Sequence, residues 1–327
     1  MKRIPFLPDT YTFLLAGTVV LASILPASGS FAVVLKYVTS AAIALLFFLH
    51  GAKLSRQAVV NGLTHWRLHA LILSCTFIFF PVMGFVLKPL LLPLVDEELY
   101  RGVLYMCMLP ATVQSAVALT GIAKGNVPAA VCSASVSTLI GIMITPFLVN
   151  GLIIPTTGSA SSLDSVVNIF AQLMLPFLAG HFLRPYFDNA FKKAGKALSY
   201  IDRGSILLVI YSAFSAAVVG GIWLQVSTLM VIALAAISLV FLALAMGFIY
   251  GLTKLFGFSR EDRVTALFGG AQKSLASGVP MAQVLFVPSV AGVMVLPLMI
   301  FHLLQLVVSS MLAQRWRDQA KDEIKVA

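Results

Sequence analysis

Phe268-Gly269-Gly270-Ala271-Gln272-Lys273-Ser274-Leu275-Ala276-Ser277-Gly278-Val279-Pro280 is a polar, glycine-broken passage inside a long hydrophobic stretch of the chain. A lysine at the centre of a membrane helix costs roughly 2.5 to 3.5 kcal/mol, and such residues face the protein interior. The glycine pair and the proline predict an interrupted helix. Interrupted helices at mid-membrane turn free backbone groups toward a cavity. We therefore expect the Lys273 amine to lie in an aqueous crevice; the alternative is a lysine that snorkels to the membrane surface.

The composition identifies an integral membrane protein. The 327 residues are 60% hydrophobic and 10% charged, and the mean hydropathy of +0.99 is far above that of a soluble domain. Apolar runs last about twenty residues, which suits α-helices that cross ~30 Å of hydrocarbon better than β-strands. Cys75, Cys107 and Cys132 lie in such runs without a CxxC spacing. We interpret them as small packing residues and expect no disulfide or metal cluster.

Ten membrane-spanning helices can be drawn, joined by short connections. Their expected ranges are 11–27, 31–50, 68–92, 100–122, 127–152, 166–187, 204–224, 229–256, 263–286 and 290–312. The longest connection, 51–67, is expected to be a surface helix or an ordered loop. We predict a single transmembrane domain over residues 1–327, with a cytoplasmic tail at 313–327.

The positive charges predict the orientation in the membrane. Eighteen of the 22 Lys and Arg residues fall at the N-terminus or in connections on its side, whereas the opposite side has Lys36, Lys88 and Arg101. By the positive-inside rule both termini are cytoplasmic, in a plasma or inner membrane. The excess of Lys and Arg on the cytoplasmic side explains the formal net charge of +10. This charge therefore does not indicate a nucleic-acid partner, and we expect none.

The acidic residues and histidines limit the possible coupling groups. All twelve Asp and Glu residues, Asp202 among them, fall in expected connections or tails, so ion sites that depend on a carboxylate within a span are disfavoured. His50 and His181 lie near cytoplasmic ends, where hydration explains them. His302 lies deeper. We take Lys273 and His302 as the candidates for ion or proton coupling.

The chain contains a weak internal repeat. Gln114-Ser115-Ala116-Val117-Ala118 in the fourth span resembles Gln272-Lys273-Ser274-Leu275-Ala276 in the ninth, at an offset of 158 positions. The same offset moves the first five spans close to the starts of the last five. Five helices per half predict two inverted repeats, about 11–152 and 166–312. Pro110 in one half and Gly269-Gly270 in the other predict that helices 4 and 9 are discontinuous and cross.

The two breaks would bring polar side chains together at mid-membrane. The expected substrate site consists of Thr112, Gln114, Ser115, Gln272, Lys273 and Ser274. Half-helix N-termini and a lysine attract a carboxylate, sulfonate or phosphate group. The alternative for each hydroxyl is a bond to its own helix. In the fifth span, Ser133, Ser137 and Gly141 form a stripe of small residues that predicts tight packing against the broken helix.

At these residues the chain resembles the bile acid:sodium symporter family, solute carrier family 10 and its bacterial relatives, over essentially its whole length. The most specific matches are Leu109-Pro110, Lys124-Gly125-Asn126-Val127, Ser135-Val136-Ser137-Thr138-Leu139 and Gln272-Lys273-Ser274. Residues 51–69 and Lys273 look most like the orphan branch that includes the seventh vertebrate member. The resemblance implies a panel of helices 1, 2, 6 and 7, a core of the other six, and transport of organic anions with sodium by alternating access.

The chain departs from the sodium-binding pattern that the resemblance implies. Phe268 stands where sodium-coupled members carry a glutamate, and Lys273 stands where they carry an asparagine. The other altered positions are the helix-four pair at Gln114-Ser115 or Ser115-Ala116, Thr76 in helix 3, and Ala130 and Ala134 in helix 5. Ser115, Gln272 and Thr76 remain as sodium candidates, and no cofactor is expected.

These observations together predict a secondary transporter of a small organic anion, coupled to sodium, to protons or to neither. One hypothesis is that the Lys273 ammonium supplies the charge that a bound sodium supplies in relatives, either exchanging its proton or staying charged. The alternative function is a membrane regulator or scaffold that keeps the transporter fold without transporting. An enzyme is not expected, because the sequence has no nucleophile-and-base motif, HExxH motif or paired intramembrane carboxylates.

Overall fold

The computed structural model describes residues 10–53, 65–153 and 163–326 of the chain. Within these ranges every regular element is a helix. Six helical segments are long and apolar enough to cross a bilayer: Gly29–Lys53, Trp66–Val86, Val127–Leu152, Ala197–Val219, Thr228–Leu255 and Pro288–Gln319. The protein is therefore an all-helical integral membrane protein.

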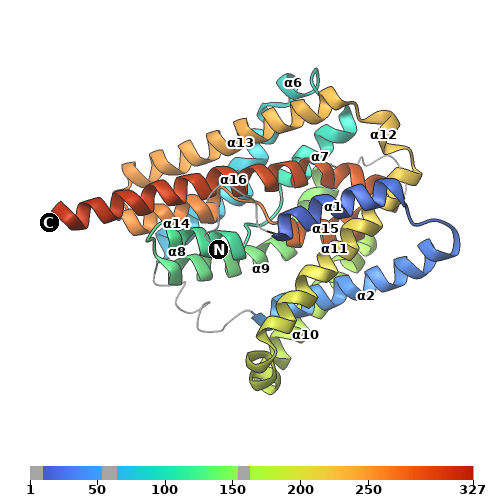
Figure 1. Cartoon of the computed structure of the whole chain (residues 1–327), viewed down its shortest axis with the longest axis horizontal. Coiled ribbons are helices and arrows are strands. Elements are labelled where there is room, and N and C mark those ends of the chain that lie inside the picture. The colour runs from blue at the N-terminus through green and yellow to red at the C-terminus, as the bar shows by residue number, and fades with distance from the viewer. Residues whose placement is uncertain (1–9, 54–64, 154–162, 327) are drawn as a thin grey trace.

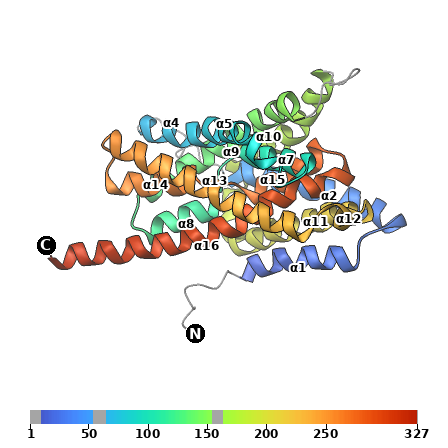
Figure 2. The same cartoon turned by 90° about the horizontal axis from the view of Figure 1, so that it is seen from above.

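Four helices form one side of the molecule, which we call the panel. They are α1 (Thr10–Ile24), α2 (Gly29–Lys53), α10 (Leu163–Lys193) and α11 (Gly195–Val219). These helices pack largely on one another and occupy the lower and right-hand part of Figure 1; in Figure 2 α1 lies at the outer edge. Large apolar side chains such as Phe31, Val34 and Tyr37 of α2 are exposed, as expected of a surface that meets lipid.

Two glycines allow α2 and α10 to approach each other backbone to backbone. A Cβ atom at Gly51 would collide with the carbonyl of Phe177 in α10, and one at Gly180 would collide with the carbonyl of Phe48 in α2. The obstructing atoms belong to the main chain, which cannot rotate away as a flexible side chain can. Small residues at such contacts are how membrane helices pack closely. The two helices are thus fixed to each other at this point.

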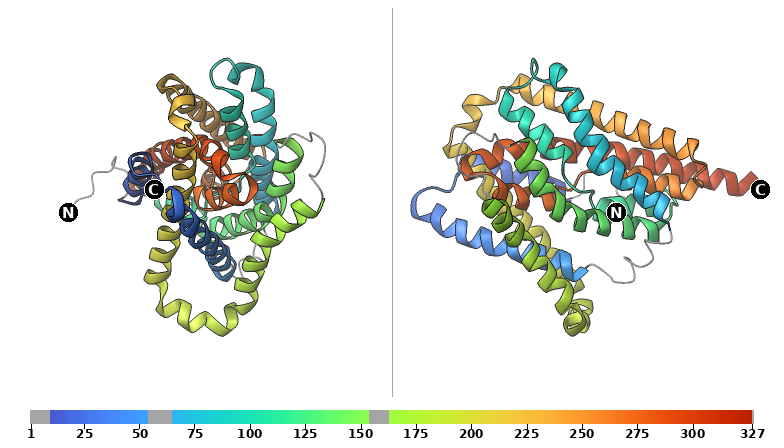
Figure 3. Two further views of the ribbon diagram at one scale, coloured as in Figure 1. Left: turned by 90° about the vertical axis from the view of Figure 1, so that its right-hand side faces the viewer. Right: turned by 180° about the vertical axis from the view of Figure 1, so that it is seen from behind.

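The remaining long helices form a second group, which we call the core. Its elements are α4 (Trp66–Ser74), the π-helix η1 (Cys75–Phe79), α5 (Phe80–Val86), α6 (Lys88–Leu91), α7 (Glu97–Cys107), α8 (Gln114–Ile122), α9 (Val127–Leu152), α13 (Thr228–Leu255), α14 (Arg260–Gly270), α15 (Leu275–Leu285) and α16 (Pro288–Val326). The short α12 (Ile222–Gln225) joins the two groups. α16 runs along the molecule and contacts both (Figures 1 and 3). Panel and core are the two helix groups that the resemblance implies.

Side-chain caps determine where several core helices begin. Asp96, Asn126, Ser227, Ser259 and Ser274 each accept a hydrogen bond from a first-turn amide of α7, α9, α13, α14 and α15, respectively. Such caps satisfy amides that have no partner inside the helix, and each stabilises it by about 1 kcal/mol. Short polar residues between the apolar runs therefore encode these helix starts.

Two helical rods of the core are interrupted. Residues 108–113 separate α7 from α8, and residues 271–274 separate α14 from α15. In the first break, Pro110 has no backbone N–H and so removes one helical hydrogen bond. The second break follows directly on Gly269-Gly270, where backbone freedom is high. Both breaks lie where the sequence predicts them.

Several observed helices extend beyond the expected spans. α9 has the predicted bounds, but α11 begins at Gly195 rather than at 204, and α16 continues through the expected tail to Val326. Asp202 therefore lies inside α11, and it is buried. The prediction that every acid lies in a connection or tail is wrong at Asp202, and also at acids such as Glu97 in α7, Glu261 in α14 and Asp318 in α16, because hydropathy locates only the apolar part of a helix. Residues 54–64 of the expected surface helix or loop at 51–67 lie outside the described residues.

Candidate functional site

The two helix breaks contact each other inside the core. The Ser274 amide donates to the Pro110 carbonyl at 3.0 Å. The Ser115 hydroxyl lies 2.9 Å from Gln272 Oε1 and 3.1 Å from Thr112 Oγ1. Gln272 has no exposed surface, whereas Ser115 lies on the edge of the cavity described below. The interrupted rods are thus joined by both a main-chain and a side-chain hydrogen bond.

Side chains of α9 satisfy backbone groups that the first break leaves free. Thr145 donates its hydroxyl hydrogen to the Met108 carbonyl at 2.8 Å. The Ala111 amide donates to the Ser137 hydroxyl at 3.0 Å. Because a buried backbone group without a partner costs about 1–3 kcal/mol, these bonds make the break tolerable inside the protein.

The small residues of α9 allow it to pack closely on this break. A Cβ atom at Gly141 would lie only 2.6 Å from the nearest atom of the Pro110 ring. The tight packing expected from Ser137 and Gly141 is confirmed. Ser133, the third residue of the predicted stripe, instead makes a 2.6 Å hydrogen bond with His69 of α4.

The Lys273 ammonium is enclosed by three backbone carbonyls. Nζ donates to the carbonyls of Thr76 at 2.8 Å, Cys107 at 2.8 Å and Leu109 at 2.9 Å. It also lies 4.2 Å from the centre of the Phe80 ring, which is within the range of a cation–π attraction. The side chain has no exposed surface. An ammonium has three donor hydrogens, so three carbonyls satisfy it without a carboxylate.

These carbonyls are free because the helices that carry them are irregular. In η1 the Phe80 amide bonds the carbonyl of Cys75, five residues back. The next position along the chain is Pro81, which has no amide hydrogen, so the Thr76 carbonyl lacks a partner in its own helix. The carbonyls of Cys107 and Leu109 are free because α7 ends at Cys107, so the residues at the Pro110 break provide no helical partner for them. The lysine therefore binds acceptors created by one π-turn and one helix break.

Gln305 of α16 holds the backbone of Lys273. Its Oε1 accepts from the Lys273 amide at 2.8 Å, and its Nε2 donates to the Lys273 carbonyl at 2.9 Å. The Gln305 Nε2 atom also lies 2.8 Å from His302 Nδ1. The buried Gln305 side chain thus links the second break to His302.

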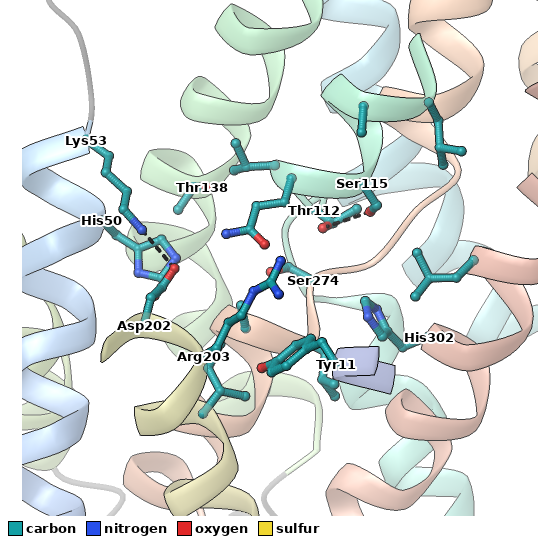
Figure 4. A pocket seen from close by; sticks show the side chains of 18 of the residues that line it. Tyr11, His50, Lys53, Thr112, Ser115, Thr138, Asp202, Arg203, Ser274 and His302 are labelled. Carbon is teal, nitrogen blue, oxygen red and sulfur yellow. Dashed lines mark hydrogen bonds and ion pairs between the residues drawn. The ribbon is translucent and has the colours of Figure 1, made fainter. Parts of the chain in front are cut away.

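A cavity of about 590 Å³ lies between the panel and the core. Its core wall includes the first turns of α8 and α15 and the middle of α16, and its panel wall includes parts of α1, α2, α10 and α11. Figure 4 shows side chains from both groups converging on this space. The volume falls within the range of ~300–1,000 Å³ that is typical of sites for small molecules.

Charged side chains of the panel line one side of the cavity. Lys53 Nζ and Asp202 Oδ2 form an ion pair at 2.7 Å, in which Asp202 is buried while the Lys53 side chain is 44% exposed. The Arg203 side chain reaches toward the middle of the cavity (Figure 4), and its guanidinium carbon lies 5.1 Å from the centre of the Tyr11 ring. Two cationic groups and one carboxylate therefore give this wall a net positive charge.

The predicted site residues divide into two groups. Those on the cavity wall are Thr112, Gln114, Ser115, Ser274 and His302. Gln272, Lys273 and Thr76 are instead buried in the packed core, and the Thr76 hydroxyl bonds the Ile72 carbonyl of its own helix at 2.8 Å. The expectation that the Lys273 amine lies in an aqueous crevice is wrong, because the freed carbonyls draw it into the packed interior where the two breaks meet.

Lys53, Asp202 and Arg203 were missed as site residues by sequence reasoning, which treated them as charges in connections. A signal for Asp202 exists in the helical spacing of α11. Asp202 is followed by the buried residues Ile206, Val209 and Ala213 at intervals of four, three and four, which places it on the buried face. Lys53 is the last described residue of α2, and a lysine after an apolar run gives no comparable signal in the sequence.

A helical membrane protein in which two interrupted rods meet beside a cavity has the architecture of a secondary transporter. The chain belongs to the SBF-like CPA transporter family, whose model matches residues 9–318. It is therefore a transporter and not an enzyme.

The relatives agree with this assignment. An uncharacterized protein of Pseudomonas aeruginosa is 52% identical over 98% of this chain and 97% of its own length. "Putative symporter YfeH" of Escherichia coli K12 is 47% identical over 96% and 94%, respectively. Sodium/bile acid cotransporter 7 of Danio rerio is 29% identical over 84% and 82%. The predicted resemblance to bile acid:sodium symporters, and to their seventh-member branch, is confirmed.

Proposed function

We propose that the protein moves a small organic anion across the membrane by alternating access, with the cavity between panel and core as its substrate site. The observation that carries the proposal is a cavity of about 590 Å³ with a positively charged wall. A cavity between two separately packed helix groups can open to one side and then to the other when one group rocks against the other.

The lining of the cavity favours an anion with a hydrocarbon body. The exposed part of Lys53 and the Arg203 guanidinium offer positive charge, and the N-terminal ends of α8 and α15, which border the cavity, add partial positive charge. Gln114 and Ser115 provide hydrogen-bond donors. The rest of the wall includes apolar residues, among them Leu119, Ile122, Val131, Phe177, Ile206 and Leu306. An amphipathic carboxylate or sulfonate fits this lining better than an inorganic anion.

We extend the proposal to the arrangement in the membrane. α1, α2, α4 to α5, α7 to α8 and α9 would form one repeat of five spans at 11–152, and α10, α11, α13, α14 to α15 and α16 the inverted second repeat at 166–312. The equivalent positions of the two breaks support this assignment. With both termini cytoplasmic, the charged wall of the cavity faces the cytoplasm, and the described conformation opens inward.

Lys273 enters the proposal as a resident cation. An ammonium has three donor hydrogens, one for each of the three carbonyls, whereas a neutral amine has only two and would leave one carbonyl unpaired. As a fixed cation, Lys273 would hold the two breaks together. We therefore propose that transport does not require sodium at this crossing, although relatives are named sodium/bile acid cotransporters.

The substrate proposal can be tested with purified protein and pairs of organic probes. Each pair consists of an amphipathic carboxylate or sulfonate, including a conjugated bile acid, and its uncharged analogue. We expect anionic members to raise the unfolding temperature and to enter liposomes that contain the protein. Arg203→Gln should abolish both effects, whereas Arg101→Gln, which changes an arginine outside the cavity wall, should not. Equal stabilisation by the uncharged analogues would contradict the proposal.

The sodium proposal needs a separate measurement. Uptake of a transported probe should be unchanged when sodium outside the liposomes is replaced by potassium. Lys273→Asn and Lys273→Gln remove the charge and should reduce uptake in either salt. Sodium-stimulated uptake by the unmodified protein would show that Lys273 does not replace a coupling ion.

A further inference from the structure

Asp202 is unusual among the acids because it is buried beside the cavity. Of the Asp and Glu residues whose burial the structure describes, Asp202 is the one that is buried, with 3% of its surface exposed. Its Oδ2 accepts from Lys53 Nζ at 2.7 Å. Its Oδ1 is buried and has no hydrogen-bond partner within the described residues. The carboxylate therefore depends on Lys53 for most of the compensation of its charge.

A solute in the cavity can reach the Lys53 ammonium, whereas the Asp202 carboxylate is enclosed by protein and stays in place. The Lys53 side chain is 44% exposed and that of Asp202 4%, and both line the cavity. Arg203 lies next to Asp202 in α11 and directs its guanidinium toward the cavity centre (Figure 4). A carboxylate or sulfonate that binds Arg203 thus approaches Lys53 and competes with Asp202 for the ammonium.

Among the described residues, Lys53 is the ion-pair partner of Asp202, so loss of Lys53 would leave this buried carboxylate unpaired. Burying an unpaired charge is far more costly than burying its neutral form, so such a group takes up a proton. The other charged or titratable groups on the cavity wall are Tyr11 of α1, His50 of α2, Arg203 of α11 and His302 of α16. His50 Nδ1 lies 2.7 Å from the Leu46 carbonyl, and His50 is the other candidate for receiving a proton near Lys53.

We propose that Asp202 is the proton-coupling site of this transporter: an anionic solute takes Lys53 as its counter-ion, and Asp202 binds one proton from the cavity water in exchange. The only covalent bond that forms in this step is the O–H bond of the protonated Asp202 carboxyl group. A monoanion and a proton then occupy the cavity together, so the site gains no net charge when it fills. This inference rests on the proposed transport of an organic anion and assigns to it electroneutral symport with one proton.

The exchange can be tested without any solute. Lys53→Met imitates the state in which the ammonium has been taken away. We expect Lys53→Met to gain thermal stability, relative to the unmodified protein, as the pH falls from about 8 to about 5, because protonation removes the unpaired charge. The double variant Lys53→Met/Asp202→Asn should lose this gain, whereas Lys53→Met/His50→Gln should keep it. The proposal would be overturned if Lys53→Met/Asp202→Asn gained as much thermal stability at low pH as Lys53→Met, or if Lys53→Met gained none.

Transport then tests the stoichiometry. In liposomes with a pH gradient, the steady-state accumulation of a monoanionic probe should follow the proton ratio, about tenfold per pH unit. In Asp202→Asn the accumulation ratio should fall to about one. If the accumulation ratio reached by the unmodified protein did not depend on the pH gradient, proton coupling would be excluded. If no anionic probe bound or moved, the transport proposal would fail, whereas the stability series would still decide whether Asp202 takes up a proton when Lys53 is removed.

Discussion

Lys273 and Lys53 place the same chemical group in two very different surroundings. Lys273 Nζ is bound by three main-chain carbonyls and has no exposed surface. Lys53 Nζ is bound by one carboxylate, and nearly half of its side chain is exposed. Carbonyls are neutral and cannot leave the backbone, whereas a carboxylate can be replaced by another anion. The first lysine is therefore built to stay in place, and the second is built to change partners.

The comparison separates two tasks that the sequence assigned to one residue. Lys273 was expected both to attract the substrate and to supply the charge that a bound sodium supplies in relatives. In the structure its ammonium is enclosed by backbone carbonyls where the two helix breaks meet, while the charges that face the cavity come from the panel. Stability measurements that treat the two lysines differently should therefore test the distinction most directly.

The largest effect is expected from Lys273→Met. The substitution leaves three buried carbonyls without a donor, and we expect it to destabilise the protein by roughly 3–5 kcal/mol. The measurement is the unfolding temperature in detergent, with Lys36→Met, an exposed lysine, as control. Loss of stability no greater than in that control would mean that the carbonyl cage contributes little. In Lys273→Ala, a small alkylammonium ion should restore part of the loss.

An intermediate effect is expected from Thr145→Val. Valine has nearly the same shape as threonine but leaves the Met108 carbonyl unpaired, so we expect a loss of about 1–3 kcal/mol. Thr138→Val is the matched control on the same helix, because the Thr138 hydroxyl bonds only the Ala134 carbonyl of its own helix in the described structure. Equal effects of the two substitutions would show that the break does not depend on α9.

The smallest effect is expected from Lys53→Arg, and Lys273→Arg serves as its comparison. At Lys53, which is partly solvated, a guanidinium can still pair with Asp202, so Lys53→Arg should change stability by at most about 1 kcal/mol. At Lys273 the closed cage fits an ammonium and not a planar fork, and Lys273→Arg should be much the more harmful of the two. Comparable unfolding temperatures for the two variants would remove the distinction between a closed and an open site.

Much of the fold follows from the sequence because length and hydropathy are strong signals in a membrane protein. The apolar run of α9 lies between Asn126, which caps it, and the end predicted at 152, and its bounds agree with the structure. The breaks follow from Pro110 and from Gly269-Gly270, whose backbone chemistry is local. The start of α11 could not be placed in this way, since its first turns are polar and hydropathy does not detect them.

The site was less predictable because its main contacts involve groups that the sequence does not distinguish. The position of Lys273 in an apolar stretch predicted that it faces the protein interior, but not that it is packed away from water, and its partners are carbonyls, which every residue carries. Which three are free depends on a π-turn before Pro81 and on a break in another helix. Arg203 and Lys53 look like ordinary loop charges until the panel and the core are seen to enclose the space between them.

The reciprocal contact of Gly51 and Gly180 with the carbonyls of Phe177 and Phe48 limits how the cavity can close. Sliding of α2 along α10 would move residues that carry a Cβ atom to the positions of the two glycines and against these carbonyls, so we expect the two helices to move as one piece. Panel movement is then a swing rather than a shear. Spectroscopic labels on α2 and α10 should keep their separation through the transport cycle, while the separation between α11 and α16 changes.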